Sequence, residues 1–298
     1  MPSREKILTQ QVAGALAEDI GVGDVTSLAV IPDDQTVVAE IVAKSDGILC
    51  GLPLCEFTFL NVDPDLEFKP LIDEGAPFAR GNQVALISGQ CRSILTAERT
   101  GLNFLMHLSG IATLTHKMID AAGSDKVKIL DTRKTTPGLR YIEKYAVATG
   151  GGENHRYGLY DMVLIKDNHI AAAGSVTEAV KRAREFMKSE SFLKIFHTDP
   201  SGLDVEVEIE TMEQLHEALA CGVKRLLLDN RTPAKLAEMV RIVRSSEGGT
   251  DVKLEASGNV TLANIHEVAQ TGVDYISIGA LTHSAPGADF SLKLLSDE

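Results

Sequence analysis

Residues 129–141 read "ILDTRKTTPGLRY", where an apolar run passes directly into charge. Ile129 and Leu130 have the character of a buried strand, and Asp131, Arg133 and Lys134 follow at its carboxyl end. Charges that adjoin a buried strand are costly to desolvate unless a partner offsets them. The stretch therefore predicts a strand end at which something binds, with the Pro-Gly pair turning the chain after it.

The same arrangement recurs along the chain. Five more runs are apolar in the middle and polar at the carboxyl end: "DMVLIKDNH" (161–169), "VEVEIE" (205–210), "KRLLLDN" (224–230), "VKLEASGN" (252–259) and "DYISIGALT" (274–282). The further polar or small residues at these ends are Lys166, Asp167, Asn168, His169, Glu206, Glu208, Asp229, Asn230, Glu255, Ser257, Gly258 and Gly279. Helical stretches fill the gaps, and three of them, beginning at residues 211, 232 and 261, open with a Thr suited to capping.

Strands that alternate with helices indicate βαβ units and a parallel sheet. In an α/β barrel all the carboxyl ends converge on one face, whereas an open doubly wound sheet gathers ligands only near its switch point. Six polar ends favour the barrel. We therefore predict an α/β fold whose C-terminal part, residues 111–283, is an incomplete TIM-like barrel that carries catalysis.

The first part of the chain has a different texture. Residues 5–20 have the apolar stripe of an amphipathic helix, residues 36–95 contain short β-branched or alternating runs, and residues 96–122 return to helix with a possible break at Ser109-Gly110. The pattern of residues 36–95 predicts an antiparallel sheet. We assign residues 1–110 to an N-terminal α+β sandwich domain and expect residues 284–298 to pack back on it.

Composition excludes several classes of protein. The net charge of -13 and the pI near 5.1 argue against a nucleic acid or an anionic membrane as partner, because both require a basic surface. No apolar run approaches the roughly 18 residues of a membrane-spanning helix, and the first ten residues lack a signal-peptide pattern. A cytoplasmic location is expected. The four cysteines lie in apolar surroundings without metal-ligand spacing, which predicts buried reduced thiols.

Three groups of residues indicate chemistry. The first is cationic: Arg133, Lys134, Arg140, His155, Arg156, Lys166 and His169. Cations gathered near one mouth repel one another unless anions join them, so we expect a polyanionic small ligand. For Arg140 and Lys144, on an expected helix start, exposed surface is the simpler interpretation.

The second group is acidic and comprises Glu206, Glu208 and Asp229. Residues two apart on a strand face the same side, so both glutamates point together. Carboxylates beside phosphate-binding groups suit Mg²⁺, and ion pairs with nearby lysines are the alternative.

The third group is glycine-rich: "ATGGGENHRYG" (148–158), "EASGNV" (255–260) and "SIGAL" (277–281). In barrels the last two strands often form a phosphate site. The three groups together suggest a pyrophosphate or phosphosugar reaction. A Schiff base on Lys134 or Lys166 is the alternative, but it leaves the arginines unused.

The residues also resemble a known family. "DTRKTTPGLR" (131–140), "YAVATGGGENHRYGLYDMVLIKDNHI" (145–170), "VEVEIET" (205–211), "LLLDN" (226–230), "EASGNV" and "YISIGALTHS" (275–284) are similar in sequence and order to the quinolinate phosphoribosyltransferases, the carboxylating nicotinate-nucleotide pyrophosphorylases. "EDIGVGDVTS" (18–27) and "AERTGLNFLMHLSGIAT" (97–113) extend the likeness to the first part. The resemblance implies phosphoribosyl transfer from phosphoribosyl pyrophosphate to quinolinate, with Mg²⁺ and with decarboxylation.

The resemblance also implies roles for individual residues. Arg133, His155, Arg156 and Lys166 would hold the substrate carboxylates, and Lys134 would lie at the sugar-phosphate side. Glu208 and Asp229 would meet the ribose hydroxyls and Mg²⁺, so that Lys134, Lys166, Glu208 and Asp229 form the catalytic set. Ser257, Gly258 and Gly279 would bind the 5′-phosphate, with Thr135 and Asn259 also at the substrate. Arg99 would enter the active site of a neighbouring subunit, which implies a homodimer with shared sites.

Two departures from the family remain. Residues 186–204 form a longer segment than in compact members, and we expect an extended helix and a surface loop there. The acidic phosphoribosyl pyrophosphate motif of other transferases is absent, since only Asp73 and Glu74 resemble it. A related transferase with a different acceptor and a non-catalytic anion-binding barrel remain as alternatives.

Overall fold

The computed structural model describes residues 4–197 and 203–295. The chain forms two compact units that are interleaved in sequence. The first unit comprises Met1–His116, Thr135–Gly151 and Ala280–Glu298, and the second comprises Lys117–Lys134 and Gly152–Gly279. The sequence places a single boundary near residue 110, but the long helix α4 (Cys91–Ala122) runs through that position.

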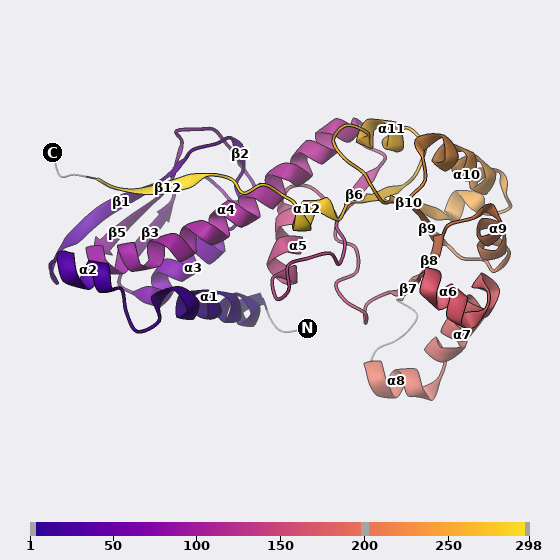
Figure 1. Cartoon of the computed structure of the whole chain (residues 1–298), viewed down its shortest axis with the longest axis horizontal. Helices are drawn as coiled ribbons and strands as arrows, with labels where there is room; N and C mark the ends of the chain where they lie inside the picture. Colours follow the sequence, from indigo (N-terminus) through magenta and orange to yellow (C-terminus); the bar gives the residue numbers. More distant parts are fainter. Residues whose placement is uncertain (1–3, 198–202, 296–298) are drawn as a thin grey trace. The chain divides into compact units, whose positions relative to one another are not determined.

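The first unit is built on an antiparallel sheet with the strand order β12-β1-β5-β3 (Figure 1). Its strands are β1 (Thr36–Ala43), β3 (Glu67–Pro70), β5 (Gln83–Gln90) and β12 (Phe290–Leu295). A separate two-stranded sheet consists of β2 (Gly47–Ile48) and β4 (Pro77–Phe78). The predicted N-terminal antiparallel sheet is confirmed, and the last strand of the chain completes it by pairing with β1.

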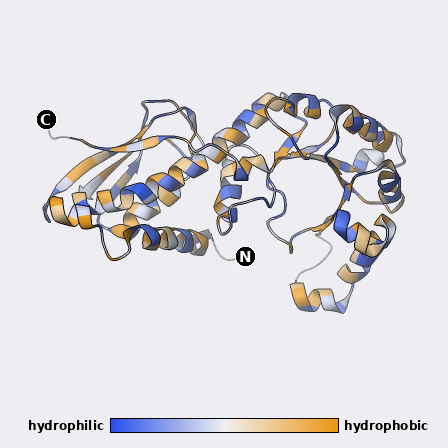
Figure 2. Ribbon diagram, viewed as in Figure 1, coloured by the Kyte–Doolittle hydropathy of each residue, from blue (hydrophilic) through white to orange (hydrophobic). Residues whose placement is uncertain are grey.

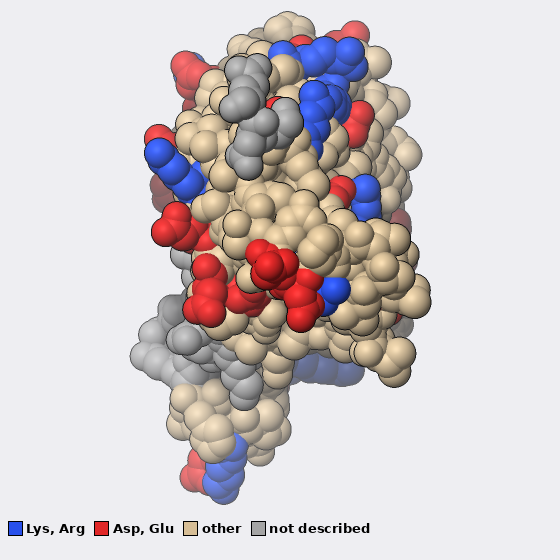
Figure 3. Space-filling model, turned by 90° about the vertical axis from the view of Figure 1, so that its left-hand side faces the viewer, with Lys and Arg blue, Asp and Glu red and all other residues tan. Residues whose placement is uncertain are grey.

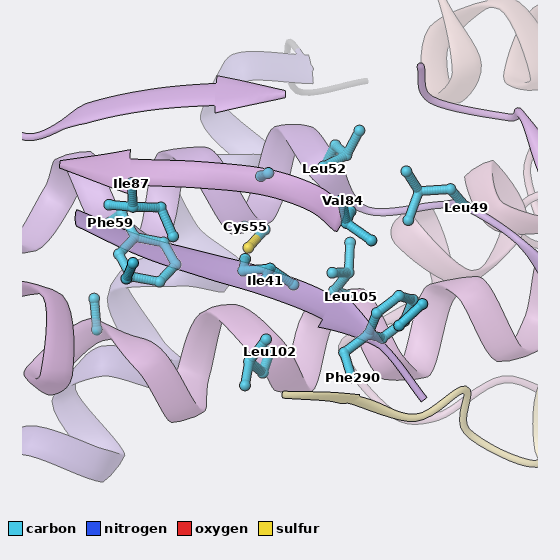
Figure 4. Close-up of a cluster of buried hydrophobic side chains, with 14 of the residues drawn as sticks. Ile41, Leu49, Leu52, Cys55, Phe59, Val84, Ile87, Leu102, Leu105 and Phe290 are labelled. Carbon is cyan, nitrogen blue, oxygen red and sulfur yellow. The ribbon is translucent and has the colours of Figure 1, made fainter. Parts of the chain in front are cut away.

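The helices of this unit are α1 (Arg4–Ile20), α2 (Val25–Val30), α3 (Leu52–Val62), most of α4, α5 (Arg140–Thr149) and α12 (Ala280–His283). Helices α3 and α4 contribute to the core of the sheet. Helix α5 buries Lys144 completely, so the exposure predicted for Lys144 was wrong. Figure 4 shows side chains of β1, β5, α3 and α4 meeting in one cluster, with Phe59, Ile41, Leu102 and Leu105 among its buried members. All four cysteines are free thiols, and only Cys221 is partly exposed.

Helix α3 is absent from the sequence-based prediction, which expected only strands there. Its residues "LPLCEFTFLNV" are apolar on nearly every side and five of them are buried, so no amphipathic stripe distinguishes the helix from a buried strand. The helix begins after Gly51, which has φ 104°, and carries Pro53 in its first turn, a position where the missing N–H costs nothing. The prediction for this segment was therefore wrong.

The predicted break at Ser109-Gly110 was also wrong, because α4 continues through it. Ser109 Oγ accepts a hydrogen bond from Cys50 N and donates one to Cys50 O, at 2.9 and 3.0 Å. A Cβ on Gly110 would lie 2.3 Å from Pro286 O. The small residues thus serve close packing of the helix against its neighbours.

The second unit is built on a parallel sheet with the strand order β6-β11-β10-β9-β8-β7. Its strands are β6 (Lys128–Leu130), β7 (Val163–Ile165), β8 (Val205–Ile209), β9 (Arg225–Asp229), β10 (Lys253–Ser257) and β11 (Tyr275–Ser277). All six were predicted from the sequence. The order is cyclic except between β6 and β7, where the described residues show no ladder and Leu130 bridges only Glu153. The barrel is therefore incomplete, as predicted, and its carboxyl ends lie at one edge.

Helices pack outside this curved sheet (Figure 1). They are α6 (Asp167–Ala173), α7 (Val176–Met187), α9 (Met212–Ala220), α10 (Pro233–Ser245) and α11 (Ile265–Ala269). The short helix α8 (Glu190–Phe196) lies beyond α7, which it contacts through Phe186 and Phe192. In Figure 2 these helices carry hydrophobic and hydrophilic residues side by side, as expected for helices with one buried face. Thr211 and Thr232 cap α9 and α10 as predicted. Thr261 does not cap α11, because its N–H instead closes a turn onto Asn264 Oδ1.

Two loops differ from expectation. The Pro137-Gly138 pair does not end β6, which stops at Leu130; it forms a turn closed by Leu139 N donating to Thr136 O, with Gly138 at φ 84°, immediately before α5. The long segment 186–204 contains the end of α7 and the short helix α8, capped by Ser189. Residues 198–202 of that segment lie outside the described part.

On the face drawn in Figure 3, Lys and Arg side chains gather mainly near the top and Asp and Glu side chains gather lower down, so that neither sign covers this face. Within residues 4–197 and 203–295, every helix is too short or too polar to cross a bilayer.

Candidate functional site

The carboxyl ends of β7, β8 and β9 bring charged side chains together. Lys166 follows β7, Glu208 is the next-to-last residue of β8, and Asp229 ends β9. Lys166 Nζ donates to Glu208 Oε2 at 2.6 Å, although Glu208 is only 7% exposed. Burial and then the charge of Glu208 raise the pKa of Asp229, while Lys166 and Lys134 act in the opposite direction. These four residues, the predicted catalytic set, thus interact with one another, and we call them the mouth cluster.

Two arginines of the second unit lie close enough to repel each other. Burial and then the charge of Arg133 lower the pKa of Arg156. Arg156 Nη1 donates to Met162 O at 3.1 Å, which ties its guanidinium to the chain that leads into β7. An anion beside both groups would relieve their repulsion and could be held bidentately.

The loop that carries Arg156 is shaped by Asp131, which has no exposed surface. One of its carboxylate oxygens accepts from His155 N at 2.9 Å and the other from Asn154 Nδ2 at 2.6 Å. Asn154 Oδ1 in turn accepts from the hydroxyl of Tyr157 at 3.0 Å. The charge at the end of β6 is therefore used to fold this loop, and Asp131 is not exposed to a ligand.

Inside the barrel, four charged or titratable side chains form a second group. The guanidinium of Arg225 donates to Glu206 Oε1 at 3.1 Å and to Glu255 Oε2 at 2.8 Å. The other oxygens, Glu206 Oε2 and Glu255 Oε1, lie 3.1 and 3.4 Å from His155 Nε2. Both glutamates have no exposed surface. We call His155, Glu206, Arg225 and Glu255 the buried cluster.

The buried cluster shifts the pKa of its own members. Burial lowers the pKa of His155, but the hydrogen bonds and charges of Glu206 and Glu255 outweigh this and raise it to about 9. Burial and the neighbouring charge of Glu255 raise the pKa of Glu206. Ion pairing with the two carboxylates explains the shift of His155, whereas desolvation and repulsion between like charges explain the shift of Glu206.

The sequence alone predicts only part of the buried cluster. It places Glu206 and Glu208 on the same side of a strand, but it does not assign Arg225 or Glu255 to the site. The available signal was the two-residue period of the strands, which places Arg225 on the same side of β9 as Asp229.

A cavity of about 320 Å³ lies at the carboxyl ends of β9 and β10, beside the first turn of α10. The predicted residues Ser257, Gly258 and Asn259 line it. Gly258 has φ 93°, and a Cβ there would lie 2.2 Å from Asn230 Oδ1, so only glycine fits. A helix N-terminus and a backbone without side chains suit a phosphate.

The donors at the mouth fit Mg²⁺ chemically. Carboxylate oxygens of Asp167, Glu208 and Glu210 lie within 4.8 Å of one another, and Asp229 interacts with Glu208. Hard oxygen donors that repel each other suit a divalent cation. The alternative that the sequence left open, an ion pair with lysine, is also present, because Lys166 contacts Glu208.

Several predicted residues lie outside these groups. Arg99, on α4, and Thr135, whose hydroxyl accepts from Arg140 Nε at 3.0 Å, belong to the first unit, and the Arg99 side chain is 57% exposed. His169 Nδ1 accepts from Lys166 N at 2.9 Å, which caps α6. Gly279 follows β11 and does not line the cavity at Gly258.

Comparison with known proteins identifies two matching family descriptions. The description "Quinolinate phosphoribosyl transferase, N-terminal domain" matches residues 24–109, and the corresponding C-terminal domain matches residues 111–293. A chloroplastic carboxylating nicotinate-nucleotide pyrophosphorylase of Arabidopsis thaliana is 44% identical over 301 residues, covering 94% of this chain and 80% of the relative. The decarboxylating quinolinate phosphoribosyltransferase 1b of Nicotiana tabacum is also 44% identical, with the same coverage.

Solved structures agree with these relatives. The nicotinate-nucleotide pyrophosphorylase of Francisella tularensis superimposes with a TM-score of 0.89 at 37% identity, covering 99% of this chain and 98% of that one. The NadC protein of Streptococcus pyogenes gives a TM-score of 0.88 at 36% identity, covering 99% of this chain and all of that one. The likeness therefore extends over both units.

Proposed function

The chain belongs to the quinolinate phosphoribosyl transferase family, and on this premise we propose that it transfers a phosphoribosyl group from phosphoribosyl pyrophosphate to the ring nitrogen of quinolinate. The 2-carboxylate leaves as CO₂, and the products are nicotinate mononucleotide and pyrophosphate. The protein is accordingly a decarboxylating pentosyltransferase of NAD biosynthesis.

One observation carries the proposal: the second unit brings two arginines close to each other and, at the mouth, brings two lysines together with two carboxylates. Arg133 and Arg156 interact closely enough to affect a pKa, and the mouth cluster joins Lys134 and Lys166 to Glu208 and Asp229. A planar dicarboxylate suits the guanidinium groups. A phosphorylated sugar suits the lysines together with the cavity at Gly258.

The residues of this chain then have separable tasks. Arg133 and Arg156, with Lys166, orient the acceptor so that its ring nitrogen faces the sugar. Glu208 and Asp229 hold the ribose hydroxyls and stabilise the positive charge that develops on the ribosyl carbon as pyrophosphate departs. Lys134 offsets negative charge on the phosphate side. Ser257, Gly258 and Asn259 hold the 5′-phosphate.

Mg²⁺ completes the proposal. Glu208 and Asp229 are the residues that would hold it, and the ion would supply charge neutralisation for the departing pyrophosphate.

Decarboxylation needs little from the protein beyond position. As CO₂ leaves, the electron pair of the broken C–C bond stays on ring carbon 2, where the adjacent quaternary nitrogen stabilises it until that carbon takes a proton from solvent. Arginines that keep the 2-carboxylate out of water favour its loss, because the uncharged product is less dependent on solvation.

We further propose a homodimer in which Arg99 of one subunit enters the active site of the other. The exposed side chain of Arg99 supports this, since it is available to a second copy. The predicted cytoplasmic location stays a prediction.

The test is an assay with purified protein, quinolinate, phosphoribosyl pyrophosphate and Mg²⁺, followed by chromatography of nicotinate mononucleotide and release of labelled CO₂. We expect both products in equal amounts, none without Mg²⁺, and none when nicotinate replaces quinolinate. Absence of product with quinolinate, or equal turnover of nicotinate, would overturn the proposal in favour of a different acceptor or of simple anion binding.

A further inference from the structure

The buried cluster occupies the interior of the barrel. Three of its members, Glu206, Arg225 and Glu255, take no part in the proposed reaction steps. Glu206 and Glu255 are fully buried, and the Arg225 side chain is 18% exposed. Each glutamate uses one oxygen for Arg225 and turns the other toward His155. Burying two carboxylates is costly unless their remaining lone pairs accept hydrogen bonds. Both free oxygens lie near the same atom, His155 Nε2, so this nitrogen must carry a proton if it is to donate to them.

The contact made by the other ring nitrogen of His155, Nδ1, shows where the ring proton lies. The backbone N–H of Arg156 donates to His155 Nδ1 at 2.7 Å. A nitrogen that accepts a hydrogen bond carries no proton, so the single proton of the neutral ring lies on Nε2, between the two carboxylates. The ring thus links the buried cluster below it to the main chain of the residue that binds the acceptor.

The charges of the two glutamates favour a second ring proton, which would have to lie on Nδ1. It would then face the Arg156 N–H across 2.7 Å, with two donors pointing at each other. The contact between Arg156 N–H and Nδ1 therefore belongs to the neutral ring. Glu206 also interacts with Arg156 as well as with Arg225, which ties the buried cluster to the same residue a second time.

We propose that Glu206, Arg225 and Glu255 are positioning residues: they lock His155, and through it they fix the main chain and the guanidinium of Arg156 for the acceptor. None of the three touches the substrate. His155 itself acts through Arg156 and not by direct contact with a substrate carboxylate. The proposal rests on the proposed function for the identity of the acceptor.

The kinetic test compares the full chain with the Glu255→Gln variant, varying quinolinate and phosphoribosyl pyrophosphate separately. The glutamine side chain is close in size to that of Glu255, but it lacks the negative charge and therefore weakens the contacts with Arg225 and His155. We expect the KM for quinolinate to rise about tenfold, as for loss of one charge-assisted hydrogen bond, with the KM for phosphoribosyl pyrophosphate changed less than twofold.

A matched control separates positioning from general stability. Asp274→Asn also removes a carboxylate from an arginine on the same sheet, where Arg244 Nη2 lies 2.6 Å from Asp274 Oδ2, but next to the amino end of β11. It should lower the melting temperature and leave both KM values unchanged. If Glu255→Gln raises both KM values equally, or neither, the positioning role is wrong.

A second measurement uses the unaltered protein and needs no turnover. ¹⁵N NMR above pH 9, where the His155 ring is neutral, with His155 assigned from the His155→Gln variant, should show the ring proton on Nε2, both with and without quinolinate. A neutral ring with its proton on Nδ1 overturns the proposal. If the wild-type protein fails to turn over quinolinate, the proposed function fails instead, while this spectrum still decides the state of the buried cluster.

Discussion

The mouth cluster and the buried cluster share strand β8 but differ in what they leave for a ligand. Glu208, at the mouth, pairs with Lys166 and interacts with a partly exposed carboxylate, Asp229. Glu206, two residues earlier, is enclosed by Arg225 and His155 and has no exposed surface. Both glutamates lie on the same side of β8, and they differ in how far they lie from the carboxyl end of the strand. The position along the strand therefore decides whether a carboxylate is available to a ligand or is enclosed by other side chains.

The largest effect is expected when the mouth cluster loses its lysine. Lys166→Ala removes the cation 2.6 Å from Glu208 and a group that we assign to the acceptor. We expect kcat/KM to fall by about 10³-fold, as for removal of one preorganised charge at a reacting centre. Steady-state kinetics measure this, and a fall of less than tenfold would show that the mouth cluster is not catalytic.

The next effect concerns a residue of the first unit. Arg99→Ala and Arg133→Ala should each be nearly inactive. After subunit exchange, half of the dimers are mixed and one site in each mixed dimer is intact, so about a quarter of wild-type activity should return. If mass spectrometry shows exchange and activity stays absent, Arg99 does not act in the neighbouring subunit.

A smaller effect is expected at the phosphate end of the mouth. Gly258→Ala places a methyl group 2.2 Å from Asn230 Oδ1 on a residue with φ 93°, so the loop must shift. We expect the KM for phosphoribosyl pyrophosphate to rise about tenfold and the KM for quinolinate to stay within twofold, on the scale of one lost hydrogen bond to a charged group. Gly222→Ala, which also has a positive φ but nothing within 4 Å, is the control for backbone strain alone.

The comparison also explains what the sequence could predict. The six parallel strands and the mouth residues follow from a local rule, in which an apolar run ends in charge, and that rule is visible in "VEVEIE" and "KRLLLDN". The buried cluster depends on which side chains meet across β8, β9, β10 and the loop at His155, and that information is not local. Arg225 lies at the start of β9, and a charged residue at the start of a strand is usually assigned to the surface. Helix α3 was not predicted because it is apolar on nearly every side, so its sequence lacks the periodic pattern of an amphipathic helix.

The smallest effect should come from the ion pair of Asp274, which belongs to neither cluster. Burial raises the pKa of Asp274, but the hydrogen bonds from Leu254 N and from Arg244 outweigh it, so the pKa lies below its ordinary value. A carboxyl whose pKa is lower in the folded state stabilises the fold above its unfolded-state pKa, and that stability is lost as the pH falls through the folded value. The stabilisation is about 1 kcal/mol or less, because both partners are partly exposed and solvent screens them. Urea unfolding of Asp274→Asn between pH 3 and pH 7 should therefore show lower stability near neutrality and a flatter decline toward acid than the wild type. If the two declines are parallel, Asp274 does not contribute to the acid sensitivity of the fold, and it serves the buried cluster only as a neutral control.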